Sequence, residues 1–387
     1  MFTDTCQLRP SVQHNPFSPY DGAKRVLSSF HAFSPDIEAT PQQLRWDPLL
    51  VKGAENSDFV DGLTTIGGAG DTQLKNGLAI HCYNFSRDMD KKAFYNSDGD
   101  FLFVPVHGEL LITTEFGSMH VPPLHIAVVQ RGLKFSVAEV NKTGKPAIGF
   151  VLETYKGHFE LPELGPIGSN GLANAKDFQH PEATFYEDDS EWTVVNKFVG
   201  KFFQYKQNHT PYDVLGFSGT YVPYRYDLTK FNTMGTISYD HPDPSIFTVL
   251  TCPSDTPGTA VADFVIFPPR WLVAEDTFRP PWFHRNVMSE FMGNICGVYD
   301  AKAEGFLPGG ASLHNMNTAH GPDAETFTKA SNAKLEPHKV GEGSMAFMFE
   351  SAYQIVTTKW AILESGKVQQ DYWKAWQGLE KIATLPK

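Results

Sequence analysis

The sequence predicts a mainly β protein, a β-sandwich or barrel with a few short helices. Short apolar runs recur between residues 96 and 140 at roughly 8–16-residue spacing, which is typical of sandwiches and barrels built from short strands. The chain also contains 32 Gly and 27 Pro among its 387 residues, and these interrupt most apolar segments. A convincing helical pattern is confined to the C-terminal end, so long helices should be scarce.

The expected elements follow the chain in order. Residues up to about 41 have the weakest pattern of apolar residues. Residues 160–183 have neither a helical nor a strand period and predict a long ordered loop. The segment QDYWKAWQGLEKIA, residues 370–383, has aromatic and apolar residues at i, i+3 and i+4 and predicts a short amphipathic helix. Between the first two regions we expect a meander of antiparallel strands, with the apolar runs FLFV (101–104), LLI (110–112), IAVV (126–129) and FSV (135–137).

Composition limits the partners of the chain. A formal net charge of −12 and a pI near 5.6 argue against a protein that follows phosphate backbones, so we expect no nucleic acid partner. No apolar stretch approaches the roughly 18 residues of a spanning helix, and the first residues lack the pattern of a signal peptide. The four cysteines are far apart without CxxC spacing, which favours reduced thiols over disulfides. We therefore expect a soluble cytoplasmic protein without a membrane partner.

The segment PPWFHRNVMSEF, residues 280–291, places His284 six residues before Glu290. With 14 His and 44 acidic residues in the chain, such a pair is also expected by chance. Two ligands of one metal ion lie about 2 Å from it, and therefore only about 3 Å from each other. Six residues of straight strand would separate them by roughly 20 Å, and six residues of helix rise about 9 Å and turn the side chains about 120° apart. If both residues bind one ion, residues 285–289 must contain a bend.

A catalytic metal site needs a third ligand. Two histidines and one carboxylate are the usual ligand set of non-haem Fe(II) in oxygen chemistry, because they leave coordination positions open for substrate and O2. The segment EGFLPGGASLHNMNTAHGPD, residues 304–323, contains His314 and His320. His320 precedes a Gly-Pro-Asp turn that can hold the imidazole rigidly, whereas His314 could equally line the pocket. Spacing alone leaves this choice open.

A series of motifs extends along nearly the whole chain. They are QLRWDP, GLTTIGGAGDTQLKNGLAIH, FYNSDGDFLFVP, TEFGSM, QRGLKFSV, GHFELPELGPIGSNGLAN, DHPDPSIFTVLT, the segment from ADFVIFPPRW to NTAHGPD, and GSMAFMFES. This series resembles the homogentisate 1,2-dioxygenase family. The resemblance implies a cupin-like jelly-roll β-sandwich, with an N-terminal domain at residues 1–230 and a C-terminal domain carrying the iron at residues 231–387. It also implies an Fe(II)-dependent enzyme of tyrosine and phenylalanine breakdown, which converts homogentisate, a small aromatic acid, and O2 to maleylacetoacetate. A homo-oligomer, trimer or hexamer, is expected with it.

The resemblance assigns a role to individual residues. It implies that the iron ligands are His284, Glu290 and His320, that the acid/base residue is His241, and that Tyr299 and His320 adjoin the substrate. A histidine suits proton transfer because its ordinary pKa of about 6.5 lets it gain or lose a proton near neutrality. The candidate pocket residues are His314 and Arg279. The acetate group of homogentisate could pair with Arg279, Arg285 or Arg270, and the sequence does not choose among them.

The chain departs from the family pattern at its start. Family members begin with a further stretch containing a Gly-Phe-Gly-Asn-Glu-like motif, and this chain starts after it. Two alternatives therefore stay beside the main hypothesis. One is a dioxygenase of the same fold for a related hydroxylated aromatic acid. The other is an inactive cupin paralogue that lacks the N-terminal stretch. Iron content measured together with oxygen uptake would separate them.

Overall fold

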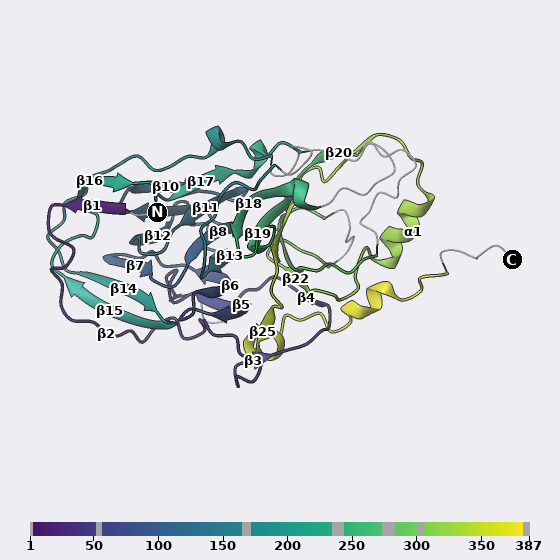
Figure 1. Ribbon diagram of the computed structural model, residues 1–387, viewed down its shortest axis with the longest axis horizontal. Helices are drawn as coiled ribbons and strands as arrows, with labels where there is room; N and C mark the ends of the chain where they lie inside the picture. Colours follow the sequence, from purple (N-terminus) through teal and green to yellow (C-terminus); the bar gives the residue numbers. More distant parts are fainter. Residues whose placement is uncertain are drawn as a thin grey trace.

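The computed structural model describes residues 3–51, 56–164, 172–233, 244–272, 283–299 and 305–381 (Figure 1). Strands dominate these residues, and helices are few and short. The helices are α1 (Ala324–Asn332), four 3-10 turns at Ala175–Asp177, Leu228–Lys230, Pro244–Phe247 and Tyr372–Trp376, and one π turn at Trp360–Glu364. The prediction of a mainly β protein with few short helices is confirmed.

The strands form three large sheets, in which every hydrogen-bonded pair except β7–β14 is antiparallel. In spatial order, the seven-stranded sheet contains β10 (Gly117–Val121), β9 (Leu110–Thr114), β12 (Phe135–Glu139), β7 (Lys92–Asn96), β14 (Trp192–Phe198), β15 (Lys201–Gln207) and β2 (Ser18–Pro19). The eight-stranded sheet contains β17 (Tyr224–Asp227), β11 (His125–Val129), β8 (Asp100–His107), β13 (Ala147–Thr154), β6 (Asn76–Phe85), β5 (Leu63–Asp71), β25 (Val356–Thr358) and β3 (Ile37–Glu38). The six-stranded sheet contains β18 (Thr248–Pro253), β19 (Ala260–Phe267), β24 (Met345–Ser351), β21 (Ser289–Cys296), β22 (Ala311–His314) and β4 (Leu44–Trp46). Two small ribbons pair β1 (Thr3–Gln7) with β16 (Val214–Gly219) and β20 (Arg270–Leu272) with β23 (His338–Val340).

The strands expected between residues 96 and 140 all form, but they do not make one meander. β8 and β11 lie in the eight-stranded sheet, whereas β9, β10 and β12 lie in the seven-stranded sheet. The chain crosses between the sheets after β8 at Gly108, whose φ of 85° is a conformation that glycine adopts without strain. Apolar residues on both sheets can then face each other, which a single flat meander would not allow.

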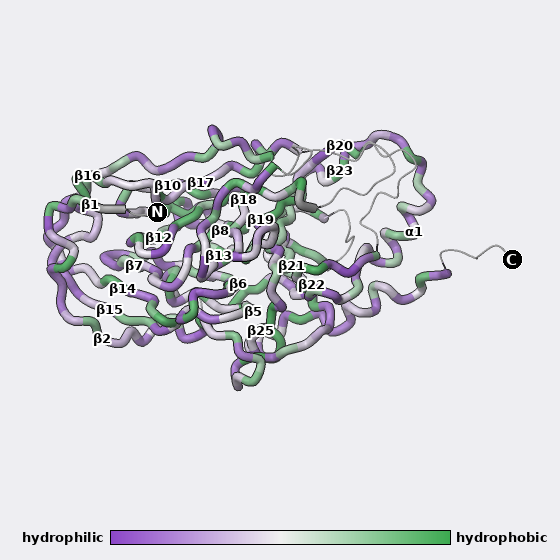
Figure 2. Tube along the Cα trace, viewed as in Figure 1, coloured by the Kyte–Doolittle hydropathy of each residue, from purple (hydrophilic) through white to green (hydrophobic). Residues whose placement is uncertain are grey.

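The eight-stranded sheet lies between the other two sheets, and its strands β6, β8 and β13 are buried along most of their length. On one side Phe103 of β8 packs on Phe135 of the seven-stranded sheet, with 5.8 Å between ring centroids. On the other side Phe150 of β13 packs on Phe347 and Phe291 of the six-stranded sheet, at 5.3 and 6.0 Å. Two apolar cores therefore hold three layers together, and Figure 2 shows the hydrophobic segments among the strands and hydrophilic ones along the outer loops.

Two of these sheets take a strand from the opposite end of the chain. The six-stranded sheet, built from strands after residue 244, ends in β4 from the N-terminal part, and Trp46 of β4 is fully buried near Phe291. The eight-stranded sheet includes β25 from the C-terminal part, paired between β5 and β3. The two halves of the sequence are thus interlocked, and the predicted domain boundary near residue 230 stays a prediction.

The six-stranded sheet carries a row of polar side chains on one face. Phe291 points toward the middle sheet, so its neighbour Glu290 points to the opposite face. Residues directly opposite in antiparallel strands share a face. The register pairs Glu290 with His314 and Glu350, Glu350 with Asp263, and Asp263 with Thr251. These five residues form what we call the polar row, which crosses five strands on the face turned away from the middle sheet.

The C-terminal end differs from its prediction. Instead of a helix over residues 370–383, the structure has the 3-10 turn at Tyr372–Trp376, followed by irregular chain up to residue 381. Gln377 is extended and Gly378 has a φ of 85°, and neither conformation continues a helix. The sequence reading also missed α1, whose N-terminus is capped by Asp323 through a hydrogen bond from the Thr326 N–H.

Two smaller expectations can be compared with the structure. All four cysteines have free thiols, as predicted. Residues 160–164 and 172–183 contain one 3-10 turn and isolated β-bridges at Glu160 and Gln179 and are otherwise irregular, which agrees with the expected loop. Within the described ranges, no helix is both long and apolar enough to span a membrane.

Candidate metal centre

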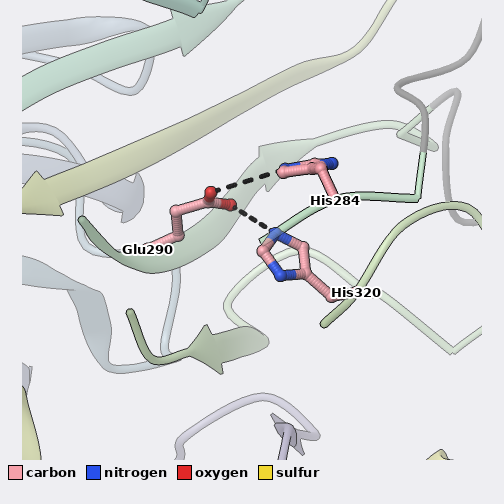
Figure 3. A group of neighbouring side chains, drawn as sticks. All are labelled: His284, Glu290 and His320. Carbon is pink, nitrogen blue, oxygen red and sulfur yellow. Dashed lines mark hydrogen bonds and ion pairs between the residues drawn. The ribbon is translucent and has the colours of Figure 1, made fainter. Parts of the chain in front are cut away.

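His284, Glu290 and His320 come together at one end of the six-stranded sheet (Figure 3). Glu290 is the second residue of β21 and therefore has a fixed direction on the polar face. The two histidines lie in irregular segments, but their backbones pair with each other. The His284 N–H donates to the His320 carbonyl at 2.9 Å, and the His320 N–H donates to the His284 carbonyl at 3.0 Å. This bridge brings residues far apart in the sequence to a common position.

The predicted bend between His284 and Glu290 is confirmed. Residues 285–288 belong to neither strand nor helix, and β21 begins at Ser289. The Asn286 side-chain oxygen accepts a hydrogen bond from the Met288 N–H at 2.9 Å, which closes a local turn. The turn folds the chain back on itself, so His284 and Glu290 lie much closer together than they would on an extended strand.

The donor atoms of the three side chains converge. His320 Nε2 lies 3.1 Å from Glu290 Oε2, and His284 Nε2 lies 3.7 Å from Glu290 Oε1. One nitrogen or oxygen from each residue can be chosen so that all lie within 4.8 Å of one another. Ligands about 2 Å from a shared ion lie about 3–4 Å apart, which fits the 3.1 and 3.7 Å separations from the two carboxylate oxygens. Both nitrogens and the carboxylate are therefore in positions that fit a metal ion.

Electrostatics keeps the carboxylate ionised. Burial alone would raise the pKa of Glu290, but the hydrogen bonds with His284 and His320 outweigh it and hold that pKa well below its usual range. On the opposite edge of its ring, His320 Nδ1 lies 2.9 Å from the Thr318 carbonyl oxygen and donates to it. With Nδ1 bonded to the backbone, Nε2 is the ring nitrogen that faces Glu290, and it could bind a metal ion in place of its hydrogen bond to that carboxylate.

His314 lies beside the three residues but has another partner. Its ring is stacked on that of His320, with 4.5 Å between centroids and 6° between planes. Its Nε2 lies 3.0 Å from the hydroxyl of Tyr372, a buried residue over which Arg45 places its guanidinium at 4.4 Å from the ring centroid. The structure therefore places His314 as a neighbour of His320, and its position in the wall of a substrate pocket stays a prediction.

The other predicted residues are distributed more widely. Tyr299 is buried, and its ring packs near Phe267 and Phe306 at 5.4 and 6.2 Å. Arg285 is exposed, and Arg270 donates to the Pro268 carbonyl and lies over the ring of Phe247. His241 and Arg279 lie outside the described residues.

Sequence reasoning missed three residues next to the centre, namely Asn286, Glu350 and Tyr372. Asn286 had a usable signal, because Asn commonly accepts from the N–H two residues later and closes a turn. Glu350 and Tyr372 had no such signal. Glu350 lies 64 residues after its partner Asn286 in the sequence, and Tyr372 lies 58 residues after its partner His314. Strand register and the C-terminal 3-10 turn bring them to the site.

Comparisons with known proteins identify the family of the chain. The family model described as homogentisate 1,2-dioxygenase N-terminal matches residues 4–228, and that described as homogentisate 1,2-dioxygenase C-terminal matches residues 229–383. The homogentisate 1,2-dioxygenases of Caenorhabditis elegans and Drosophila melanogaster are each 52% identical to this chain, over 98% of it and 85% of the relative. Among solved structures, a cupin 2 conserved barrel domain protein from Leptotrichia buccalis aligns with a TM-score of 0.31 and 7% identity, over 78% of this chain and 91% of the other. Two adjoining family models that together span nearly the whole sequence, and relatives of this identity, show that the chain belongs to the homogentisate 1,2-dioxygenase family.

Proposed function

We propose that this protein binds Fe(II) through His284, Glu290 and His320 and uses it to cleave the ring of homogentisate with O2, giving maleylacetoacetate. The observation that carries the proposal is the convergence of two imidazole nitrogens and one ionised carboxylate within 4.8 Å of one another. This donor set is the one found in non-haem iron oxygenases. Membership of the homogentisate 1,2-dioxygenase family supports the same substrate and reaction.

The residues of the chain prepare the site for this reaction. Fe(II), when bound, supplies the redox chemistry through which O2 can react with an aromatic ring. Glu290 offsets one of the two positive charges of the ion, and the two neutral imidazoles add none. Three protein donors leave positions for substrate and O2. The buried face of β21 limits water around the carboxylate.

Proton transfer is assigned to His241. The reaction is helped by removal of a proton from a ring hydroxyl, and a histidine can accept it near neutral pH. The motif DHPDPS at residues 240–245 supports this role through the family resemblance. By the same resemblance, Tyr299 and His320 contact the substrate, His314 and Arg279 line the pocket, and the enzyme works in the cytoplasm as a homotrimer or hexamer.

Oxygen uptake tests the proposed function directly. The purified protein is loaded anaerobically with Fe(II), and O2 consumption is measured with homogentisate and with related hydroxylated aromatic acids. We expect O2 uptake only when Fe(II) and homogentisate are both present, with formation of maleylacetoacetate. His120→Ala, which changes an exposed histidine on β10, should behave as the wild type. Absence of iron binding, or preference for another acid, would contradict the proposal.

A further inference from the structure

A single amide group joins two buried carboxylates at the metal centre. The Nδ2 group of Asn286 donates to Glu290 Oε1 at 2.9 Å and to Glu350 Oε1 at 2.6 Å. Glu290 and Glu350 are directly opposite each other on β21 and β24, and both are buried. Like charges in such a cross-strand pair are destabilising unless a donor or cation lies between them. Asn286 supplies a neutral donor at this point.

The orientation of the Asn286 amide follows from its neighbours. A side-chain amide has two N–H donors on its nitrogen and lone pairs on its oxygen. Here the nitrogen faces two carboxylates, and Oδ1 faces the Met288 N–H at 2.9 Å. The opposite orientation would direct the amide oxygen at two carboxylates and the amide nitrogen at another donor. The contacts thus fix one orientation, in which the two N–H groups hold Glu290 and Glu350.

We propose that Asn286 is a positioning residue of the metal centre, acting on Glu290 together with Glu350. The proposal rests on the proposed function, because it concerns how the chain prepares the site for Fe(II). Asn286 does two things at once. Its oxygen closes the turn that brings His284 back to Glu290, and its nitrogen holds Oε1 of the Glu290 carboxylate. Glu350 anchors the same nitrogen from the neighbouring strand.

The physical benefit is preorganisation. A glutamate side chain has three rotatable bonds, and the entropy lost when such a side chain is fixed upon binding opposes binding. Oε1 is held by Asn286 and Oε2 lies 3.1 Å from His320 Nε2, so the carboxylate is oriented before a metal ion arrives. Residues that orient metal ligands in this way typically contribute 10- to 100-fold to metal affinity.

Substitutions can separate the two contributions of Asn286. Asn286→Asp retains an oxygen that can accept from the Met288 N–H, but it replaces the two N–H donors by an oxygen facing two carboxylates. The turn is therefore preserved, while the hydrogen bonds from residue 286 to Glu290 and Glu350 are lost. Asn174→Asp is the matched control, because Asn174 is exposed and its Oδ1 likewise accepts from the N–H two residues later, that of Lys176. It adds the same charge in the same kind of turn, on a segment outside the metal centre.

The measurement is the Fe(II) dissociation constant, obtained by anaerobic competition with a chelator, beside the melting temperature of the iron-free protein. We expect N286D to raise the dissociation constant about 10- to 100-fold and N174D to leave it unchanged. In the double variant N286D/E350Q, the glutamine amide can donate to the new carboxylate, and we expect recovery of about tenfold of this loss. A purely structural role would lower the melting temperature and leave the affinity of the folded protein unchanged.

A second variant covers the case in which N286D does not fold. Glu350→Leu removes the carboxylate that accepts from the Asn286 amide, and we expect it to weaken Fe(II) binding several-fold. Glu350→Gln retains an acceptor oxygen, so its Fe(II) dissociation constant should stay near that of the wild type. Wild-type affinity in both N286D and E350L would overturn the proposal while leaving the proposed function intact. A wild-type protein that binds no Fe(II) would instead overturn the proposed function, and this proposal with it.

Discussion

Asp263 should make the stability of the protein depend on pH. This carboxyl lies in the polar row, between Thr251 of β18 and Glu350 of β24. Burial raises its pKa to about 6, and a hydrogen bond with Thr251 opposes this only in part. The folded chain therefore holds the Asp263 proton more tightly than the unfolded chain, whose carboxyl titrates near its ordinary value of 3.8. As pH rises from about 4 to 6, unfolding becomes easier because only the folded state carries the cost of a partly buried charge.

The magnitude follows from the pKa difference. A difference of roughly 2 units, at about 1.4 kcal/mol per unit, corresponds to about 3 kcal/mol lost between pH 4 and pH 7. An asparagine side chain at this position would be neutral at every pH in that range, so Asp263→Asn should match the wild type near pH 4. At pH 7 the variant should exceed the wild-type free energy of unfolding by up to about 3 kcal/mol.

Urea unfolding of the metal-free protein at a series of pH values tests this prediction. Taking the difference between variant and wild type removes the effect of all other titrating groups. The difference should grow from near zero at pH 4 to its plateau above pH 6. A difference that is constant with pH, or one that favours the wild type at pH 7, would refute the reasoning.

Further predictions concern the site and the buried charges. His320→Ala should lose Fe(II) together with activity, because one of the three donors is removed. His241→Asn should keep its iron while the turnover number falls by about 10² to 10⁴. Iron content and oxygen uptake are measured for both variants. Lys197→Met should lower the free energy of unfolding by about 3–5 kcal/mol, measured by denaturation, because the fully buried Lys197 ammonium pairs with Glu153 at 2.7 Å. Tyr372→Phe removes the hydroxyl that holds His314, whose ring stacks on His320. We expect Fe(II) binding to weaken several-fold, again measured by chelator competition.

Matched controls make these outcomes interpretable. Lys206→Met removes an exposed ion pair with Glu191 and should cost less than about 1 kcal/mol. Similar losses for Lys206→Met and Lys197→Met would contradict the importance of burial. A His241 variant that loses iron would make this residue structural or a ligand, and one with full activity across pH 5 to 9 would make it a bystander.

The sequence predicted local features better than their arrangement. The runs around Phe103 and Phe135 were identified as strands because apolar spacing is a local property. Their assignment to different sheets was not predictable in this way, since it depends on which apolar faces meet across layers. The pair His284 and Glu290 predicted the bend by reach alone, whereas choosing His320 over His314 depended on the family resemblance. Glu350 could not be found, because only the register of β21 and β24 brings it opposite Glu290.

The exchange of β4 and β25 between the halves has a consequence for biosynthesis. β4 leaves the ribosome early, yet its hydrogen-bonding partner β22 is encoded about 270 residues later. At translation rates of about 5–20 residues per second, this separation is a delay on the order of tens of seconds. During that interval Trp46, which ends fully buried and donates to the Ala361 carbonyl at 2.8 Å, has no sheet to enter. The segment that contains Trp46 therefore waits for its partners, and the six-stranded sheet can close only after β24 has been translated.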